Sequence, residues 1–245
     1  MSIMKSFVVT VVLLKVVLLA SLWMIFGPAS ESQSQFAAET QPTVSPVPQK
    51  NDNANRVTSE PYAGELSIFE EPERENNLQI NRVMDILKIS DQKTVADIGA
   101  GSGWFTVRAA KRVGEKGKVF AVEINQEYIN HINERAKKET LANINTILGK
   151  TDDPILPKNS VDAVLILKTY HEIAEPIRFM KNLRPALHKD ALVGIIDRNG
   201  NGDDHGIKKE TVIDEAKRAG FSLKEEFDFV KDDGMDYFLV FQLMN

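Results

Sequence analysis

The chain has 245 residues, a formal net charge of −5 and no cysteine. Without cysteine it can form neither disulfides nor thiolate metal sites, and it has no cysteine nucleophile. Lysine and arginine are dispersed in blocks no longer than a pair, so the sequence favours no nucleic-acid partner. Its four histidines lack the spacing of a zinc site, so no bound metal is predicted.

The first 27 residues contain an apolar run about as long as a membrane-spanning helix. The run, FVVTVVLLKVVLLASLWMIF, extends over residues 7–26 and holds one charge, Lys15. A bilayer needs about 20 predominantly apolar residues, and the preceding Lys5 favours a cytoplasmic N-terminus. We therefore expect residues 1–27 to anchor the chain in a membrane, with the rest on the non-cytoplasmic (periplasmic) side.

A cleaved signal peptide is the alternative for the same segment. Gly27 and Ala29 are small residues at cleavage-like spacing. However, the apolar run is longer than a usual signal core, and Pro28 lies between the two small residues. Under this alternative the chain is exported and then released from its signal.

Residues 28–61 differ in composition, because Pro, Ser, Thr, Gln and Asn dominate. Such a segment buries too little apolar area to offset the entropy of an ordered chain. We expect a disordered linker here and a folded domain over residues 62–245. At the start of that domain, YAGELSIFEEPERENN is expected to form a lid over a substrate, with Tyr62 and Phe69 as apolar contacts.

Within the domain, short apolar runs alternate with longer amphipathic segments. Strands are predicted at Thr94–Ile98, Lys118–Glu123, Ile144–Leu148, Val161–Leu167, Ala191–Asp197 and Tyr237–Gln242. Helices are predicted at Asn77–Leu87, Gly103–Val113, Gln126–Glu139, Ala174–Leu187 and Lys208–Ala219. A repeated strand-then-helix pattern is typical of a parallel sheet with helices on both faces.

Ligands of such sheets bind beyond the carboxyl ends of the strands, at the switch point in strand order. This rule selects the residues just after each strand. They are Gly99–Trp104, Glu123, Gly149–Asp153, Lys168–Glu172 and Asp197–Asn201.

The first of these segments is a glycine-rich turn, VADIGAGSGWF. Gly99 can make the tight exit from the strand, Gly101 lets backbone N–H groups approach a ligand, and Gly103 lets the next helix pack closely. The spacing G-x-G-x-G differs from the dinucleotide pattern, whose third glycine would fall at Trp104. Asp97 would repel a phosphate but suits a positive ammonium group. A tight turn without a ligand is the alternative.

Two more acidic positions follow the next strands. Glu123 ends VFAVE, where a carboxylate accepts hydrogen bonds from both hydroxyls of an adenosine ribose; the alternative is an exposed strand-end glutamate. In GKTDDP, Asp152 or Asp153 could accept from an adenine amino group, or could cap a helix or turn. An ammonium group, a ribose and an adenine together describe S-adenosylmethionine.

At this point the sequence resembles the class I S-adenosylmethionine-dependent methyltransferases. The resemblance covers about residues 68–241 and depends on VADIGAGSG, on VFAVEIN and on VDAVLILKTYHEI, while DYFLVFQL resembles the last strand of that fold. It implies a doubly wound, Rossmann-like α/β sheet of seven strands, mostly parallel with an antiparallel last strand. ALHKDALV stands where relatives often have a KPGG turn, which puts the local geometry there in doubt.

The resemblance also assigns cofactor-binding roles. In this family the glycine loop carries the methionine part, the acid of the second strand holds the ribose, and an acid after the third strand meets adenine. The residues that match are Asp97, Gly99, Gly101, Gly103, Glu123 and Asp152. The likeness is greatest to small-molecule enzymes of the quinone-biosynthesis type and uncharacterised bacterial relatives. The segment after the fourth strand lacks an NPPY-like motif, which disfavours amino methylation of DNA bases.

Methyl transfer requires alignment of an acceptor, and a base where the acceptor must lose a proton. In KTYHEI, Tyr170 could orient an acceptor and His171 could take its proton, although His171 could instead support the following helix. His205 could face the acceptor, but it lies in a glycine-rich loop, so a solvated histidine is expected.

The prediction is a methyltransferase that acts on a small-molecule acceptor. The alternative is a membrane-tethered, catalytically inactive domain of the same fold that serves as a binding module, since the cofactor is not expected outside the cytoplasm. A nicotinamide dehydrogenase is disfavoured by Trp104.

Overall fold

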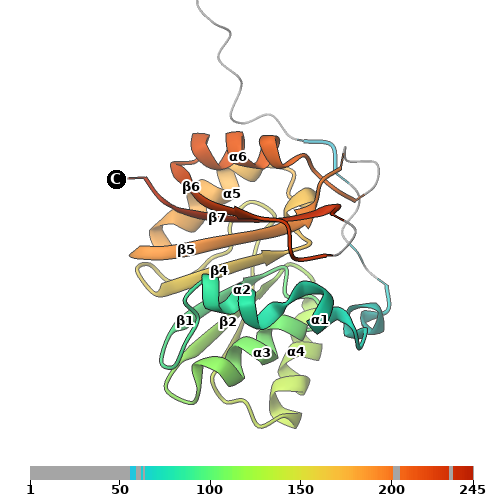
Figure 1. The fold of residues 1–245 in the computed structure, drawn as a ribbon. Coiled ribbons are helices and arrows are strands. Elements are labelled where there is room, and N and C mark those ends of the chain that lie inside the picture. Colours follow the sequence, from blue (N-terminus) through green and yellow to red (C-terminus); the bar gives the residue numbers. More distant parts are fainter. Residues whose placement is uncertain (1–55, 59–61, 63, 201–204, 232–233, 245) are drawn as a thin grey trace, which may run out of the picture. The chain divides into compact units, whose positions relative to one another are not determined.

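The computed structural model describes residues 56–58, 62, 64–200, 205–231 and 234–244 (Figure 1). All of them belong to one compact unit, Gln49–Asn245. The predicted anchor or signal, residues 1–27, lies outside the described residues, as does nearly all of the predicted linker, residues 28–61. Within the described ranges, no helix is both long enough and apolar enough to cross a membrane.

Seven strands form one sheet in the order β3-β2-β1-β4-β5-β7-β6 (Figure 1). The strands are β1 (Thr94–Ile98), β2 (Lys118–Glu123), β3 (Ile144–Leu148), β4 (Val161–Leu167), β5 (Leu187–Arg198), β6 (Phe221–Phe227) and β7 (Asp236–Leu243). Neighbours from β3 to β5 pair in parallel, whereas β7 is antiparallel to both β5 and β6. The predicted doubly wound sheet with an antiparallel last strand is thereby confirmed.

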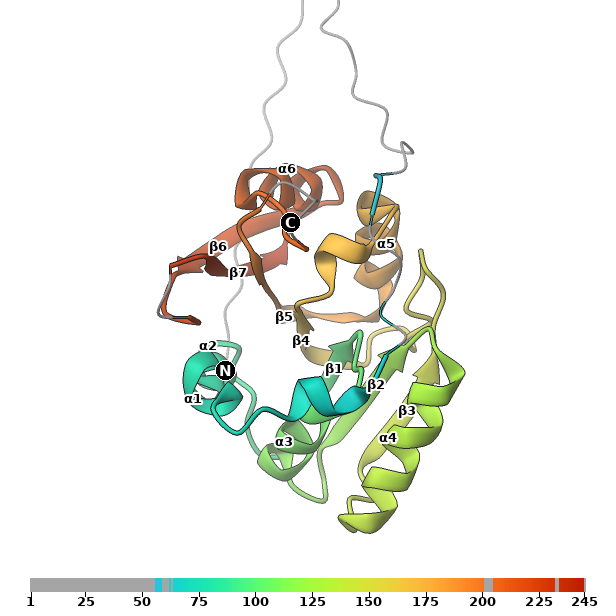
Figure 2. The same ribbon diagram turned by 90° about the vertical axis from the view of Figure 1, so that its right-hand side faces the viewer.

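Helices cover both faces of this sheet. They are α1 (Arg74–Leu78), α2 (Ile80–Ile86), α3 (Trp104–Val113), α4 (Gln126–Lys138), α5 (Pro176–Leu183) and α6 (Lys209–Arg218). Side chains of α1, α2 and α3 pack with Val95 of β1, while those of α5 and α6 pack with the adjacent Ala96. Successive strand residues point to opposite faces, so the two helical layers enclose β1 (Figure 2).

The two central strands, β1 and β4, are almost continuous apolar runs because helices cover both their faces. Every residue of β4 except Asp162 is buried. Burying one Val, Leu or Ile side chain contributes about 1.5–3 kcal/mol. The middle of the sheet is therefore a rigid support for the loops that leave its carboxyl edge, and the strand order reverses there, between β1 and β4.

One strand was not predicted from the sequence. β6 (Phe221–Phe227) lies at the edge of the sheet, and its middle residues Lys224, Glu225 and Glu226 are exposed. Charged residues protect an edge strand from pairing with another chain. They also hide the alternation of apolar and polar residues that identifies a strand.

Three predicted helices agree with the structure to within one residue at each end, and two differ by more. The helix expected at Asn77–Leu87 is divided into α1 and α2, because Gln79 adopts a left-handed conformation with φ 46°. The helix expected at Ala174–Leu187 ends at Leu183 and continues as a 3₁₀ turn through Pro185. The first boundary was wrong because a non-glycine residue with positive φ, here Gln79, gives no clear sequence signal. The second was wrong because the prediction overlooked Pro176, which starts α5, and Pro185, which cannot continue it.

Arg56 fixes the start of the described chain onto the domain. Its guanidinium forms an ion pair with Glu215 at 3.2 Å and donates to the carbonyl oxygens of Tyr170 and Ile173 at 2.7 and 2.8 Å. Its backbone N–H donates to the Ala174 carbonyl at 2.8 Å. Glu215 is buried, and burial raises its pKa, so the guanidinium supplies compensation that this carboxylate needs.

We predict that Arg56→Ala in the full chain lowers the free energy of unfolding by about 2–4 kcal/mol, since it leaves the buried Glu215 carboxylate uncompensated. Denaturant unfolding measures the change. Lys111→Ala is the matched control, because Lys111 pairs with Glu139 but its side chain is 58% exposed. That control should cost less than about 1 kcal/mol. Equal losses in the two variants would contradict a special role for Arg56.

Candidate functional site

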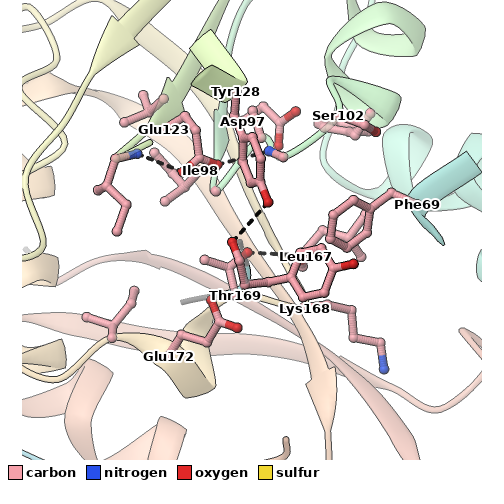
Figure 3. A pocket seen from close by; sticks show the side chains of 18 of the residues that line it. Phe69, Asp97, Ile98, Ser102, Glu123, Tyr128, Leu167, Lys168, Thr169 and Glu172 are labelled. Carbon is pink, nitrogen blue, oxygen red and sulfur yellow. Dashed lines mark hydrogen bonds between the residues drawn. The ribbon is translucent and has the colours of Figure 1, made fainter. Parts of the chain in front are cut away.

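A cavity of about 550 Å³ opens at the carboxyl edge of the sheet, where the strand order reverses between β1 and β4 (Figure 3). Its walls come from four of the five post-strand segments that the sequence singled out, together with His205. Parallel strands end at the same edge, so these loops converge although they are far apart in the sequence. The size and the largely apolar walls are those of a small-molecule site.

The glycine loop forms one wall of this cavity. Gly99, Gly101 and Gly103 have φ values of 69°, 54° and 76°, a left-handed conformation that glycine adopts without strain. Gly99 faces Thr169 at the end of β4, and a Cβ at Gly99 would lie 2.4 Å from that side chain. Gly99 and Gly101 line the cavity, whereas Gly103 precedes α3 and faces Ile132 of α4, so its role is packing.

Glu123 joins the end of β2 to the glycine loop. Its carboxylate accepts from the backbone N–H groups of Gly101 at 3.0 Å and Ile124 at 2.7 Å, and its side chain is buried against the cavity. Each carboxylate oxygen can accept more than one hydrogen bond. Glu123 can therefore hold the loop and still accept from hydroxyl groups of a ligand.

Asp97 is a buried carboxylate in the wall beneath the glycine loop. Burial raises its pKa to about 7, opposed by a hydrogen bond from the Thr106 hydroxyl at 2.6 Å and by the charge of Arg74, and reinforced by the charge of Glu123. A cationic ligand group beside it would favour the ionised form. The site is thus suited to an ammonium group, as the sequence predicted.

Trp104 occupies the position of the third glycine in a dinucleotide loop. Its ring lies between two guanidinium groups, with Arg74 at 4.6 Å and Arg108 at 3.9 Å from the ring centroid. The indole is buried and lines the cavity, so no clearance remains for a pyrophosphate at the start of α3. This geometry agrees with the sequence argument against a nicotinamide dehydrogenase.

The segment before α1 covers the cavity. We call Tyr62 and residues 64–70 the strap. Tyr62 and Phe69, the two residues predicted as apolar contacts of a lid, both line the cavity, with their rings edge-on at 5.4 Å. The Tyr128 hydroxyl donates to the Tyr62 and Gly64 carbonyl oxygens at 3.0 and 3.2 Å.

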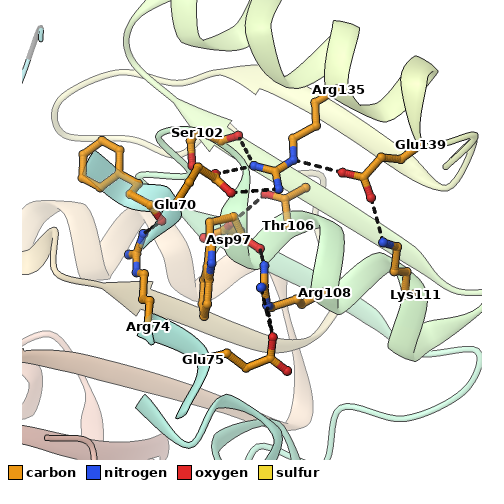
Figure 4. A network of polar contacts seen from close by, with 12 residues as sticks. Glu70, Arg74, Glu75, Asp97, Ser102, Thr106, Arg108, Lys111, Arg135 and Glu139 are labelled. Atoms are coloured by element: carbon orange, nitrogen blue, oxygen red, sulfur yellow. Dashed lines mark hydrogen bonds and ion pairs between the residues drawn. The ribbon is translucent and has the colours of Figure 1, made fainter. Parts of the chain in front are cut away.

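A polar network fastens the other end of the strap to the glycine loop (Figure 4). Glu70 accepts from the Ser102 hydroxyl at 2.6 Å and forms an ion pair with Arg135, which also donates to the Ser102 carbonyl. Arg135 continues to Glu139 at 3.2 Å. These contacts outweigh the burial of Glu70 and lower its pKa, so the carboxylate stays charged.

Asp152 does not line the cavity. Its carboxylate forms an ion pair with Arg178 at 2.9 Å, and the preceding residues Lys150 and Thr151 face the cavity instead. Asp153 accepts from the Ile155 N–H at 2.8 Å, which is the turn role considered from the sequence. The predicted contact of Asp152 with adenine is therefore not supported by this arrangement.

Tyr170 is also placed away from the cavity. Its side chain is fully buried, and its hydroxyl donates to Glu215 at 3.1 Å. Burial and the neighbouring Glu215 charge hold the pKa of this hydroxyl well above its usual range. The interpretation that Tyr170 orients an acceptor is wrong for this geometry, because the side chain supports the Arg56 contact instead.

His171 lies one layer behind the cavity wall. Its ring is nearly buried, with Nδ1 at 2.9 Å from the Asp197 carboxylate, and it is not among the lining residues. The neighbouring Glu172 and His205 do line the cavity. His205 is exposed, as expected, but it also faces the site.

Several lining residues were given no individual role from the sequence. They include Arg74, Lys168, Thr169 and Glu172. Lys168, Thr169 and Glu172 lie in a post-strand segment that the sequence rule selected, whereas Arg74 precedes the sheet and carried no signal. Across the described part of the chain, no cluster of three or more His, Asp or Glu side chains is arranged to hold a metal ion.

The fold is that of an α/β protein with a cavity at the carboxyl edge of its sheet, the place where doubly wound sheets bind nucleoside-type cofactors. Residues 95–190 match the family model described as a methyltransferase domain. Together with the seven-stranded fold, this match supports the class I S-adenosylmethionine-dependent methyltransferases as the family of this domain, with S-adenosylmethionine as the cofactor. The predicted family, fold and cofactor are confirmed.

Similar proteins share this domain but differ in what their names say they act on. The chain is 39% identical over 90 residues to the 23S rRNA (uracil(1939)-C(5))-methyltransferase RlmD of Alcanivorax borkumensis, covering 34% of this chain and 20% of that protein. It is 28% identical over 95 residues to a protein-L-isoaspartate O-methyltransferase of Methanococcoides burtonii, covering 38% and 46%. The chain therefore spans less than half the length of either relative.

Among solved structures, the SAM dependent methyltransferase from Aquifex aeolicus has the same fold. The two chains are 24% identical with a TM-score of 0.67, and the match covers 73% of this chain and 97% of that one. At this level of identity the similarity supports the fold assignment alone.

We predict that Gly99→Ala lowers the free energy of unfolding by about 2–4 kcal/mol, because left-handed strain adds to overpacking against Thr169. Gly234→Ala is the matched control: its φ of 64° imposes the same strain, but a Cβ there meets nothing within 4 Å. The control should lose only about 1–2 kcal/mol. Denaturant unfolding of both variants tests the difference, and equal losses would rule out the Thr169 contact as its cause.

Proposed function

We propose that this protein transfers a methyl group from S-adenosylmethionine to a small-molecule acceptor. The observation that carries the proposal is the joining of Asp97, the glycine loop and Glu123 around one cavity. Asp97 suits the ammonium group of the cofactor and Glu123 suits its ribose hydroxyls. The glycine loop between them has no side chains in the way, so the cofactor can approach the backbone closely. A small acceptor is favoured because the strap covers the cavity in which the acceptor must fit.

The residues present fit the cofactor. Asp97 would hold the ammonium group, and Arg74, which also lines the cavity, supplies the opposite charge that a carboxylate requires. Glu123 would accept from the ribose, and Thr151 stands where Asp152 was expected to meet adenine. When bound, S-adenosylmethionine supplies an electrophilic methyl group; the chain binds and orients the acceptor and limits access of water.

The inactive binding module is the second candidate, and the predicted export of the domain motivates it. The intact acids and glycine loop speak against loss of the cofactor site. The anchor or signal over residues 1–27 and the non-cytoplasmic location stay predictions, as does the linker. Labelled methyl transfer to an acceptor panel separates the two functions, since a binding module would bind the cofactor or a partner without turnover.

We predict that the full chain binds S-adenosylmethionine with a dissociation constant in the micromolar range, about −8 kcal/mol, and does not bind NAD. Glu123→Ala should weaken binding by about 1–3 kcal/mol, and Gly101→Val by more, because its side chain would occupy the approach to the backbone. Calorimetric titration measures both. Glu127→Ala, at an exposed position four residues along the chain, is the control and should bind normally. Absence of heat with saturating cofactor would end the proposal.

We predict that Asp97 makes both stability and cofactor affinity depend on pH. Its pKa is raised from 3.8 to about 7, so between these values the folded chain retains a proton that the unfolded chain releases. Stability from this group is therefore fully present below about pH 3.8 and is lost as the pH rises from there to about 7.

Asp97→Asn should remove that decline, making the variant more stable than the parent by about 2–4 kcal/mol at pH 8 but not at pH 4. An ammonium ligand favours the ionised carboxylate, so cofactor affinity of the parent should rise through pH 7, while that of the variant stays weak and flat. Unfolding and titration at several pH values test this. Parallel pH profiles for parent and variant would contradict it.

A further inference from the structure

A chain of polar side chains extends from the cavity into the core on its β4–β5 side. Asp197, near the end of β5, is 0% exposed. Its carboxylate accepts from the backbone N–H groups of His171 at 3.0 Å and Arg198 at 2.9 Å, and it lies 2.9 Å from His171 Nδ1. These contacts fix both the position of the imidazole and which of its nitrogens faces Asp197.

The opposite nitrogen of His171 faces Glu172. The distance from Nε2 to Glu172 Oε1 is 3.8 Å, and the His205 ring lies edge-on to His171 at 6.0 Å. With a proton on Nδ1 directed to Asp197, Nε2 keeps a lone pair toward Glu172. The order of groups from core to cavity is therefore Asp197, His171, Glu172.

Glu172 is the member that reaches the cavity (Figure 3). Its side chain is 24% exposed, and the cavity is its route to a ligand. Burial raises its pKa, the charges of Asp197 and Glu123 add to the rise, and His171 and His205 oppose it. A carboxylate with a raised pKa is a stronger proton acceptor than an exposed one.

A purely structural explanation accounts poorly for this group. The turn after β4 needs an acceptor for the backbone N–H of His171, and the Asp197 carboxylate already provides that acceptor. The His171 imidazole and the Glu172 carboxylate add a desolvation cost beside the cavity. Neither of them satisfies a further backbone hydrogen-bonding group of the turn. Titratable groups that perturb one another in a cleft are the usual arrangement of an acid–base site.

We propose that Glu172 is the catalytic base, that His171 and Asp197 are positioning residues behind it, and that the acceptor is a small apolar molecule with a dissociable hydroxyl proton, such as a phenol. This inference depends on the proposed methyl transfer. It assigns to Glu172 the role that the sequence suggested for His171.

The proton and electron balance of the step is complete. The acceptor O–H bond breaks and its proton moves to the Glu172 carboxylate. The electron pair left on the acceptor oxygen forms the new bond to the methyl carbon. The methyl–sulfur bond of the donor breaks, and sulfur keeps the electron pair and becomes a neutral thioether. The protonated Glu172, which faces His171 Nε2 at 3.8 Å, then releases its proton to solvent through the cavity.

The apolar lining of the cavity that Glu172 reaches bears on the class of acceptor. Tyr62, Phe69, Ile173 and Phe179 line the cavity and offer apolar and aromatic surface. Thr169 follows β4 near the glycine loop, and Lys168 beside it forms an ion pair with the buried Asp236. Because this lysine is already paired, the apolar lining of the cavity favours a ring with a hydroxyl over an anionic acceptor.

The test uses the full chain with labelled S-adenosylmethionine and three probes, phenol, 4-nitrophenol and benzylamine. The chain should methylate the phenols and not the amine. Glu172→Gln should lower turnover of phenol by about 10²–10⁴-fold with an unchanged cofactor dissociation constant. The loss should be smaller for 4-nitrophenol, because a more acidic hydroxyl needs less help to lose its proton.

Glu175→Gln is the matched control, since Glu175 pairs with Arg178 outside the cavity and its loss should not alter turnover. Asp197→Asn should reduce turnover less than Glu172→Gln and shift its pH profile. In the chain without cofactor, nitrogen NMR of His171 should show the proton on Nδ1, and Asp197→Asn should change that tautomer.

Three results would overturn the inference: no methylation of either phenol by a chain that binds the cofactor, equal losses for both phenols in Glu172→Gln, or a His171 proton on Nε2. Failure of the full chain to bind S-adenosylmethionine would instead overturn the proposed function itself. Binding is measured separately by calorimetry, so the two failures are distinguishable.

Discussion

The site depends on one interaction, the hydrogen bond from the Gly101 N–H to the Glu123 carboxylate. It joins the loop after β1 to the end of β2, so the left-handed glycine turn is held against the strand rather than projecting into solvent. Glu123 is buried, and a buried carboxylate must be satisfied by donors. The backbone N–H groups satisfy it, and the same charge sits close enough to Asp97 to help raise its pKa. Loop geometry and site electrostatics therefore share one cause.

The segment outside the sheet completes the site in a similar way. The strap is held at one end by Tyr128 and at the other by Glu70, which binds Ser102 within the glycine loop. Arg56 donates to the carbonyl oxygens of Tyr170 and Ile173, the residues on either side of His171 and Glu172. The chain that enters the domain thus supports both the cover of the cavity and the loop that carries the proposed base.

The sequence predicted the central strands and the glycine loop well, because apolar runs covered on both faces and closely spaced glycines are local signals. β1 to β4 have the predicted bounds. Other features arise from tertiary contacts with no local signal: the break at Gln79, the charged edge strand β6, and the ion pair that directs Asp152 to Arg178. Arg74 reaches the cavity from α1 only because α1 packs beside Trp104.

The short turn after β4 shows why residue type alone could not assign catalytic roles. Tyr170, His171 and Glu172 are consecutive in a 3₁₀ turn, so their side chains leave in three directions. The first enters the core to Glu215, the second meets Asp197, and the third reaches the cavity. Tyrosine and histidine are the more familiar acid–base residues, yet the geometry gives ligand access to the glutamate. The chemistry of this turn is decided by Asp197 and Arg56, which lie 26 and 114 residues away from their partners in the turn.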